Sequence, residues 1–110
     1  GTPERDYMYI KDAVNAYLTL AENLHRKEVL GEAFNFGTNK PISVLKLYSK
    51  IIKLMGKSVK PKILGEAKNE IDRQYLDSAK AKRILKWEPK YDLDSGLKET
   101  IGWYRKNFSK

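Results

Sequence analysis

The sequence of 110 residues contains no cysteine, which excludes disulfide bonds, thiol catalysis and thiolate metal ligands. It also lacks any run of the roughly 20 apolar residues that a membrane-spanning helix needs. The first ten residues include Glu4, Arg5 and Asp6, where a signal peptide would have an apolar core. We therefore expect a cytoplasmic protein that has no membrane partner.

Histidine is nearly absent, since His25 is the only one. A lone histidine without a carboxylate or serine at useful spacing forms neither a catalytic triad nor a metal site. No Gly-x-Gly-x-x-Gly and no Gly-x-x-x-x-Gly-Lys occurs, so nothing here builds a dinucleotide or phosphate cradle. The Tyr-x-x-x-Lys from Tyr7 to Lys11 lies on a strand-like stretch, whereas dehydrogenase chemistry needs it on a helix. We therefore expect no catalytic residue, metal or cofactor site in this chain.

Basic residues outnumber acidic ones by 22 to 14, and the formal net charge is +8. Such a surface attracts polyanions, including nucleic acid, anionic lipid and phosphorylated small ligands. Most of the basic residues are lysines, which solubilise a surface, whereas arginine is the usual reader of bases and phosphates. The charge therefore favours a solvated surface. A nucleic-acid-binding module and a protein-interaction domain are the alternatives.

The apolar pattern predicts one α+β domain over residues 1–110, mostly helical, with about four helices and a few short strands. Alternating or short apolar runs predict strands, which are residues 5–10, 33–36, 62–64 and 75–76. The clearest helix runs from an N-cap at Ser43 to a left-handed C-cap at Gly56. Asp77 is expected to cap a short helix over 78–85.

Two further helices are expected after Asp12 and Asp94, each acting as an N-cap. The first has an apolar stripe at helical spacing, formed by Val14, Tyr17, Leu18, Ala21 and Leu24. The last has a stripe formed by Leu97, Ile101, Tyr104 and Phe108. Helices this one-sided need a broad surface to cover, and the short strands supply little of it. The chain is therefore expected to be a piece of a longer protein.

Four ordered segments resemble the C-terminal part of extended short-chain dehydrogenase/reductases, the NAD-dependent nucleotide-sugar epimerases and dehydratases. They are Arg5-Asp-Tyr-Met-Tyr-Ile-Lys-Asp12, Phe34-Asn-Phe-Gly37 with Ser43-Val-x-x-Leu47, Gln74-Tyr-Leu-Asp77 with Leu85-Lys-Trp87-x-Pro89, and Gly96-Leu97-x-x-Thr100-x-x-Trp103-Tyr104. Within the family, the stretch from Glu70 to Asp77 looks most like CDP-glucose 4,6-dehydratases.

The resemblance implies a set of residues that bind the nucleotide sugar. Arg5 matches the arginine that contacts the diphosphate, and Glu70 matches a position that reaches the nucleotide ribose. Asn35 matches an asparagine that lies close to the substrate site, and Gln74 falls near the sugar-facing side of the loop that contains Glu70. Many members have a second diphosphate-binding arginine where this chain has Ala67, and Lys68 is the candidate replacement. Asp77 and Trp87 match positions that serve helix capping and core packing.

The resemblance also implies what the longer protein would be. Family members place an NAD-binding Rossmann domain, with the catalytic Tyr-x-x-x-Lys, before the part that this chain matches. The chain would then be the substrate-binding domain of a nucleotide-sugar 4,6-dehydratase (a lyase) or 4-epimerase (an isomerase), detached from that domain and inactive alone. The expected partners are a nucleotide-diphosphate sugar and the protein's own Rossmann domain, in a homo-oligomer.

Overall fold

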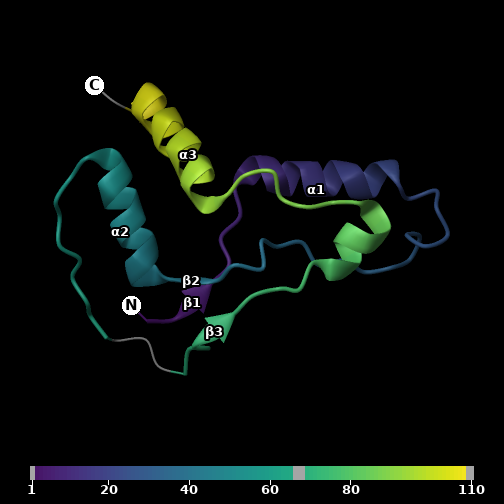
Figure 1. The fold of residues 1–110 in the computed structure, drawn as a ribbon, viewed down its shortest axis with the longest axis horizontal. Helices are drawn as coiled ribbons and strands as arrows, with labels where there is room; N and C mark the ends of the chain where they lie inside the picture. Colours follow the sequence, from purple (N-terminus) through teal and green to yellow (C-terminus); the bar gives the residue numbers. More distant parts are fainter. Residues whose placement is uncertain (1, 66–68, 109–110) are drawn as a thin grey trace.

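The computed structural model describes residues 2–65 and 69–108 (Figure 1). It has three two-residue strands and four helical elements in these ranges, one of them a π-helix. In chain order they are β1 (Glu4–Arg5), α1 (Ile10–Glu22), β2 (Ile42–Ser43), α2 (Val44–Met55), β3 (Arg73–Gln74), η1 (Ala81–Leu85) and α3 (Leu93–Phe108). The mixed helix-and-strand architecture agrees with the predicted α+β class.

The strands form one small sheet with β1 in the centre, in the order β2-β1-β3. β1 pairs antiparallel with β2, so that Arg5 lies opposite Ile42, and parallel with β3, so that Arg5 lies opposite Gln74. Residues 5–10 were predicted as one strand, but the chain leaves the sheet after Arg5 because no neighbouring backbone continues the ladder. The predicted strands at 33–36, 62–64 and 75–76 are wrong for the same reason.

Helix α2 begins and ends where the sequence predicts. The Ser43 hydroxyl accepts a hydrogen bond from the Lys46 backbone N–H at 3.2 Å, and Gly56 adopts the left-handed conformation with φ of 68°. Both signals are local, because a cap needs only residues within one turn of the helix end. After α2, residues 57–65 form neither helix nor strand and lead back toward the sheet (Figure 1).

Helix α1 begins at Ile10 after an N-cap at Tyr9, three residues earlier than predicted, and Asp12 is not its cap. The Asp12 carboxylate is buried and accepts hydrogen bonds from the backbone N–H groups of Lys90 (2.9 Å) and Tyr91 (3.2 Å). Its partners therefore lie in the connection before α3, nearly 80 residues along the chain. Asp12 ties α1 to that connection.

The cap of α3 also differs from the prediction. Asp92, not Asp94, accepts a hydrogen bond from the Ser95 backbone N–H at 2.7 Å, and α3 begins at Leu93. Asp94 instead forms an ion pair with Lys50 of α2 at 2.9 Å. The Asp77 prediction is confirmed in its chemistry, because that carboxylate accepts from the Ala79 N–H at 2.9 Å as the chain becomes helical toward η1.

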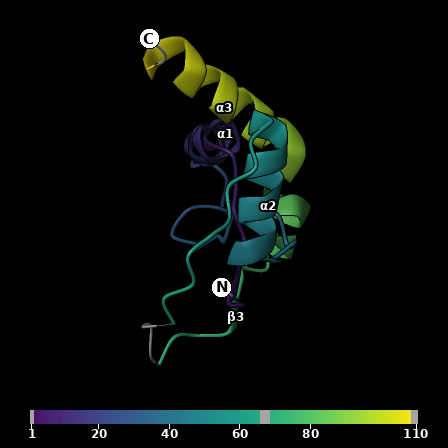
Figure 2. The same ribbon diagram turned by 90° about the vertical axis from the view of Figure 1, so that its left-hand side faces the viewer.

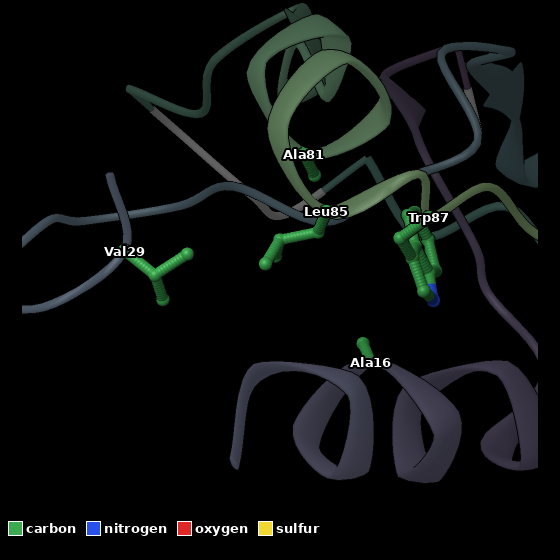
Figure 3. Packing of buried hydrophobic residues seen from close by; sticks show 5 residues of the cluster. All are labelled: Ala16, Val29, Ala81, Leu85 and Trp87. Atoms are coloured by element: carbon green, nitrogen blue, oxygen red, sulfur yellow. The ribbon is translucent and has the colours of Figure 1, made fainter. Parts of the chain in front are cut away.

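The core lies between α1 and η1 (Figure 3). Its buried apolar residues come from α1, the loop after α1, η1 and the turn that follows η1. The Trp87 ring is 2% exposed and meets the Phe36 ring edge-on, with the ring centroids 5.0 Å apart. The cluster consists of Ala16, Val29, Ala81, Leu85 and Trp87.

The molecule is flat, with principal extents of 51 × 38 × 18 Å, and Figure 2 views it edge-on with α1 end-on. Its radius of gyration is 16.9 Å, whereas a compact domain of this length has about 13 Å. A thin layer leaves much apolar surface uncovered, as the one-sided helices predict. On α1, for example, Tyr17 is 76% exposed.

Candidate functional site

Two of the predicted binding residues meet at the end of the central strand. Arg5 Nη2 lies 3.4 Å from Glu70 Oε1, although the residues are 65 positions apart in sequence. Arg5 Nη1 donates to the Glu4 carbonyl at 2.8 Å, which fixes the other arm of the guanidinium. The Arg5 side chain is 25% exposed, so it is held in one geometry and still reachable from solvent.

A third predicted residue, Gln74, is brought beside them by the sheet. It lies opposite Arg5 in the parallel β1–β3 pair, and the Glu4 backbone N–H donates to the Asp72 carbonyl at 2.6 Å. Arg5 and Gln74 line one hollow of about 290 Å³. Its other lining residues are Asp6, Met8, Phe36, Gly37, Tyr75 and Leu76.

A larger cleft of about 680 Å³ contains Glu70. Its walls are the start of the chain, the first two turns of α2, the connection after α2 and the segment leading to β3. Glu70 lines this cleft and its ion-pair partner Arg5 lines the hollow, so the Arg5–Glu70 pair contributes one residue to each of the two spaces. The cleft is lined by Thr2, Pro3, Val44, Leu45, Tyr48, Pro61, Lys62, Ile63, Leu64, Gly65, Asn69, Glu70 and Asp72.

The groups around Arg5 suit a ligand that carries both phosphate and hydroxyl groups. A guanidinium offers several N–H donors in a fixed fork that matches phosphate oxygens. The Glu70 carboxylate accepts hydrogen bonds from hydroxyls, and the Gln74 amide both donates and accepts. A phosphate that takes over one arm of Arg5 would free Glu70 for a hydroxyl.

The remaining predicted residues lie elsewhere or outside the described ranges. Asn35 is exposed between Phe34 and Phe36 and does not line the hollow that contains Arg5, so its role stays a prediction. Lys68, with Ala67 beside it, falls outside the residues that the structure describes.

The larger cleft also contains Tyr48 and Lys62, two polar residues that the sequence pattern did not indicate as site residues. Tyr48 was assigned to no site because it lies in the apolar stripe of α2, yet its hydroxyl donates to the Val59 carbonyl and holds the connection after α2. Lys62 was included only in a predicted strand. Two features of the sequence could have indicated them: the phenol of Tyr48 lies within the otherwise aliphatic stripe of α2, and Lys62 is a cation in the long connection after α2.

A second polar cluster lies away from these spaces and joins α1 to α3. Lys11 Nζ donates to Glu99 Oε1 at 3.0 Å, and this contact raises the pKa of Lys11 and lowers that of Glu99. Partial burial raises the pKa of the neighbouring Tyr91 hydroxyl. These shifts follow from an ion pair that links two helices, and we assign the cluster a structural role.

Two general features complete the description of residues 2–65 and 69–108. None of the helices there combines the length and the apolar character needed to cross a membrane. Over the same residues, no group of three or more histidine or acidic side chains is arranged to hold a metal ion.

Comparison with known sequences identifies relatives over nearly the whole chain. Residues 1–100 match the family described as GDP-mannose 4,6 dehydratase. The chain is 32% identical to a UDP-glucuronate 4-epimerase of Thermodesulfobacterium geofontis, over 97% of this chain and 32% of that protein. It is 34% identical to a dTDP-D-glucose 4,6-dehydratase of Bos taurus, over 98% of this chain and 31% of that protein. The chain thus spans about a third of the length of these relatives.

Solved structures give the same result. A UDP-glucose 4-epimerase of Thermotoga maritima, solved with UDP-glucose, superposes with a TM-score of 0.83 at 33% identity, over 99% of this chain and 34% of that one. A UDP-glucuronic acid 4-epimerase of Bacillus cereus, in complex with UDP-glucuronic acid and NAD, gives 0.85 at 28% identity, over 98% and 34% of the two chains.

These matches confirm the resemblance carried by the four sequence segments, and they do not favour a nucleic-acid-binding or protein-interaction module. CDP-glucose is named in none of the matches described above. The family match covers most of the chain, and the relatives are epimerases and 4,6-dehydratases of nucleotide sugars. The chain therefore belongs to the GDP-mannose 4,6 dehydratase family, among the nucleotide-sugar epimerases and dehydratases of the short-chain dehydrogenase/reductase group.

Proposed function

We propose that this chain is the nucleotide-sugar-binding part of an NAD-dependent 4,6-dehydratase or epimerase. One observation carries the proposal: Arg5 contacts Glu70 and lies opposite Gln74 in the sheet, and each of the three residues lines the hollow or the larger cleft. They come from segments about 70 residues apart, and the small sheet holds them together. Relatives that bind UDP-glucose and UDP-glucuronic acid share the fold.

Each residue has a role that its chemistry supports. The Arg5 guanidinium binds the diphosphate, and the arm that now contacts Glu70 turns to the phosphate oxygens. Glu70, released from that contact, accepts hydrogen bonds from the ribose hydroxyls. Gln74 faces the sugar from the hollow. Asn35 and Lys68 complete the proposed binding set, Asn35 near the sugar and Lys68 as a further cation at the diphosphate.

We expect NAD to be bound outside the described residues. The three strands have two residues each, and the chain between β1 and α1 contains none of the glycines that a dinucleotide-binding turn needs. In the longer protein, NAD is therefore held by a Rossmann domain encoded before residue 1, together with the catalytic groups. This chain alone binds the nucleotide sugar weakly and has no activity.

The exposed apolar face of α1 supports the same arrangement. Val14, Tyr17 and Leu18 are 49%, 76% and 56% exposed, which is unusual for large apolar side chains on one helix face. The family match leaves about two thirds of each relative outside this chain, enough for a domain that covers this face. We assign the face to contact with the Rossmann domain of the same protein.

Binding measurements test the proposal directly. The 110-residue chain, and any longer product of the same reading frame, is titrated calorimetrically with CDP-, UDP-, GDP- and dTDP-glucose. CDP-glucose is expected to bind most tightly, because the stretch from Glu70 to Asp77 resembles CDP-glucose 4,6-dehydratases. Arg5→Ala is expected to weaken binding at least tenfold, since it removes charge-assisted hydrogen bonds.

The matched control is Arg83→Ala, which removes an exposed arginine of η1 that lines neither space. It loses the same charge and leaves affinity unchanged. Equal affinities of the two variants would contradict the role of Arg5. Failure of the longer protein to bind any of the four sugars would contradict the proposed function as a whole.

A further inference from the structure

A polar network connects the end of β1 to the turn at residues 37–39. Asp6 Oδ2 accepts hydrogen bonds from the backbone N–H groups of Thr38 at 2.8 Å and Asn39 at 2.9 Å. The Thr38 hydroxyl bonds the other carboxylate oxygen of Asp6. Since Asp6 directly follows Arg5, the turn at 37–39 is fixed relative to the guanidinium.

The same turn holds the segment that follows β3. Asn39 Oδ1 lies 3.3 Å from both the Ser78 backbone nitrogen and the Ser78 hydroxyl, and that hydroxyl is 3.1 Å from the Gly37 carbonyl. Ser78 is buried and lies four residues after Gln74. The Asn39 amide therefore links the Arg5 side of the site to the Gln74 side, beside the contact of the Ser78 hydroxyl with the Gly37 carbonyl.

Asn39 can serve as this link because its backbone is left-handed, with φ of 61°. Asparagine tolerates that conformation better than most residues with a side chain. The turn is also crowded: a methyl group on Gly37 would lie 2.8 Å from Asp6 Oδ2 and 3.3 Å from the Leu76 carbonyl. The close approach of three segments at this turn thus requires glycine at 37 and suits asparagine at 39.

The network matters because the sheet itself is so small. β1 and β3 share a register of only two residue pairs, which supplies few backbone hydrogen bonds. A strand pair this short needs other contacts to keep its alignment. The Asp6–Asn39–Ser78 contacts lie one residue beyond the pair on β1 and four residues beyond it on the β3 side.

We propose that Asn39 is a positioning residue, which keeps Gln74 and Glu70 in register with Arg5 through its side-chain contact with Ser78. It lines neither the hollow nor the larger cleft, so it acts through the residues that do. The effect on ligand affinity rests on the proposed function, whereas the effect on strand register does not.

The test removes the amide and keeps the backbone conformation. Asn39→Gly deletes the side chain at a position where glycine is equally at ease. Lys86→Gly is the matched control, because Lys86 also has a positive φ, of 57°, but follows η1 away from the site. Asn39→Asp is the conservative variant: it keeps an oxygen that accepts from Ser78 and should retain the wild-type behaviour.

Two readouts are measured on the 110-residue chain. The first is amide hydrogen exchange of Glu4, whose N–H donates to Asp72 across the β1–β3 pair, relative to that of Trp87, whose N–H donates to Ala81 in the core region. The second is the dissociation constant for UDP-glucose. For Asn39→Gly we expect about fivefold faster exchange at Glu4 with Trp87 unchanged, and about fivefold weaker binding, which corresponds to the loss of about one net hydrogen bond.

Every outcome decides the proposal. Unchanged exchange at Glu4 in Asn39→Gly overturns the proposal. Equal acceleration at Glu4 and Trp87 also overturns it, because Asn39 would then contribute to global stability only. The same effect in Lys86→Gly also overturns it. If the wild-type chain does not bind UDP-glucose, the exchange rates at Glu4 and Trp87 decide the role of Asn39, and the titrations of the longer protein decide the proposed function.

Discussion

The two faces of helix α1 reverse the usual rule for what is buried. The inner face presents Asp12 and Ala16, which are 1% and 3% exposed, and the outer face presents Tyr17 and Leu18, which are 76% and 56% exposed. A charged residue is therefore inside and the large apolar ones are outside. The inner face is therefore fixed by specific contacts within this chain, whereas the outer face has exposed apolar side chains and is the face that we propose to contact a Rossmann domain.

The largest effect is expected from a substitution in the core cluster between α1 and η1. Trp87→Ala removes the largest side chain of the core cluster, which is 2% exposed and meets the Phe36 ring. Such truncations cost about 3–5 kcal/mol through lost burial and the cavity left behind. We expect the variant to be largely unfolded in isolation, as measured by circular dichroism and urea titration. A cooperative transition with a wild-type midpoint would show that the stability of the chain comes from elsewhere.

The second test addresses the buried carboxylate. Asp12→Ala leaves the N–H groups of Lys90 and Tyr91 without their acceptor, and we expect the free energy of unfolding to fall by about 2–3 kcal/mol. Asp12→Asn keeps one acceptor oxygen and is expected to lose less. Urea denaturation of both variants provides the measurement. Equal stability of Asp12→Ala and wild type would mean that α1 is held by apolar contacts alone.

The outer face should respond in the opposite way. Tyr17→Ser with Leu18→Gln is expected to change the stability of the isolated chain by less than about 0.5 kcal/mol, because both side chains are mostly exposed. The same pair should lower the stability of a longer protein in which a Rossmann domain covers the face. Urea titrations of the short and long proteins give the comparison. A large loss in the short chain would place these side chains within its own core.

The two faces also show which features the sequence could predict. The caps of α2 and the short-range role of Asp77 were predicted because both partners lie within a few residues of each other. The outer stripe of α1 was predicted from its period, and so was its need for a surface to cover. Asp12 was misassigned as a cap because an N-cap and a buried acceptor of distant N–H groups look alike in sequence.

The site was predictable in part, for a related reason. The family resemblance indicated Arg5, Glu70 and Gln74 as binding residues, and the structure brings these three together. The strands that do so could not be located from local pattern, because two-residue strands are defined by their neighbours and not by their own alternation. The contacts of Asn39 could not be predicted from the sequence, because their atoms belong to three segments that meet only in the fold.

The smallest effect is expected at Asp92, an exposed carboxylate acceptor, in contrast to the buried Asp12. Asp92 caps α3, whereas Asp12 is not a helix cap. The hydrogen bond from the Ser95 backbone N–H to the Asp92 carboxylate lowers the pKa of Asp92 below its ordinary value of 3.8. A carboxylate with a lowered pKa in the folded state adds stability above its unfolded pKa, and that stability is lost as the pH falls through the lowered value.

The substitution Asp92→Asn preserves the shape of the cap and removes the titrating carboxyl group. The stability difference between wild type and Asp92→Asn is measured from urea midpoints at pH values from about 2 to about 7, a range that includes the carboxyl pKa of about 4. The difference should be constant near neutrality and shrink below about pH 4. Glu22→Gln, an exposed carboxylate on α1, is the control. A difference that grows on acidification would reverse the sign required by the hydrogen bonds at Ser95.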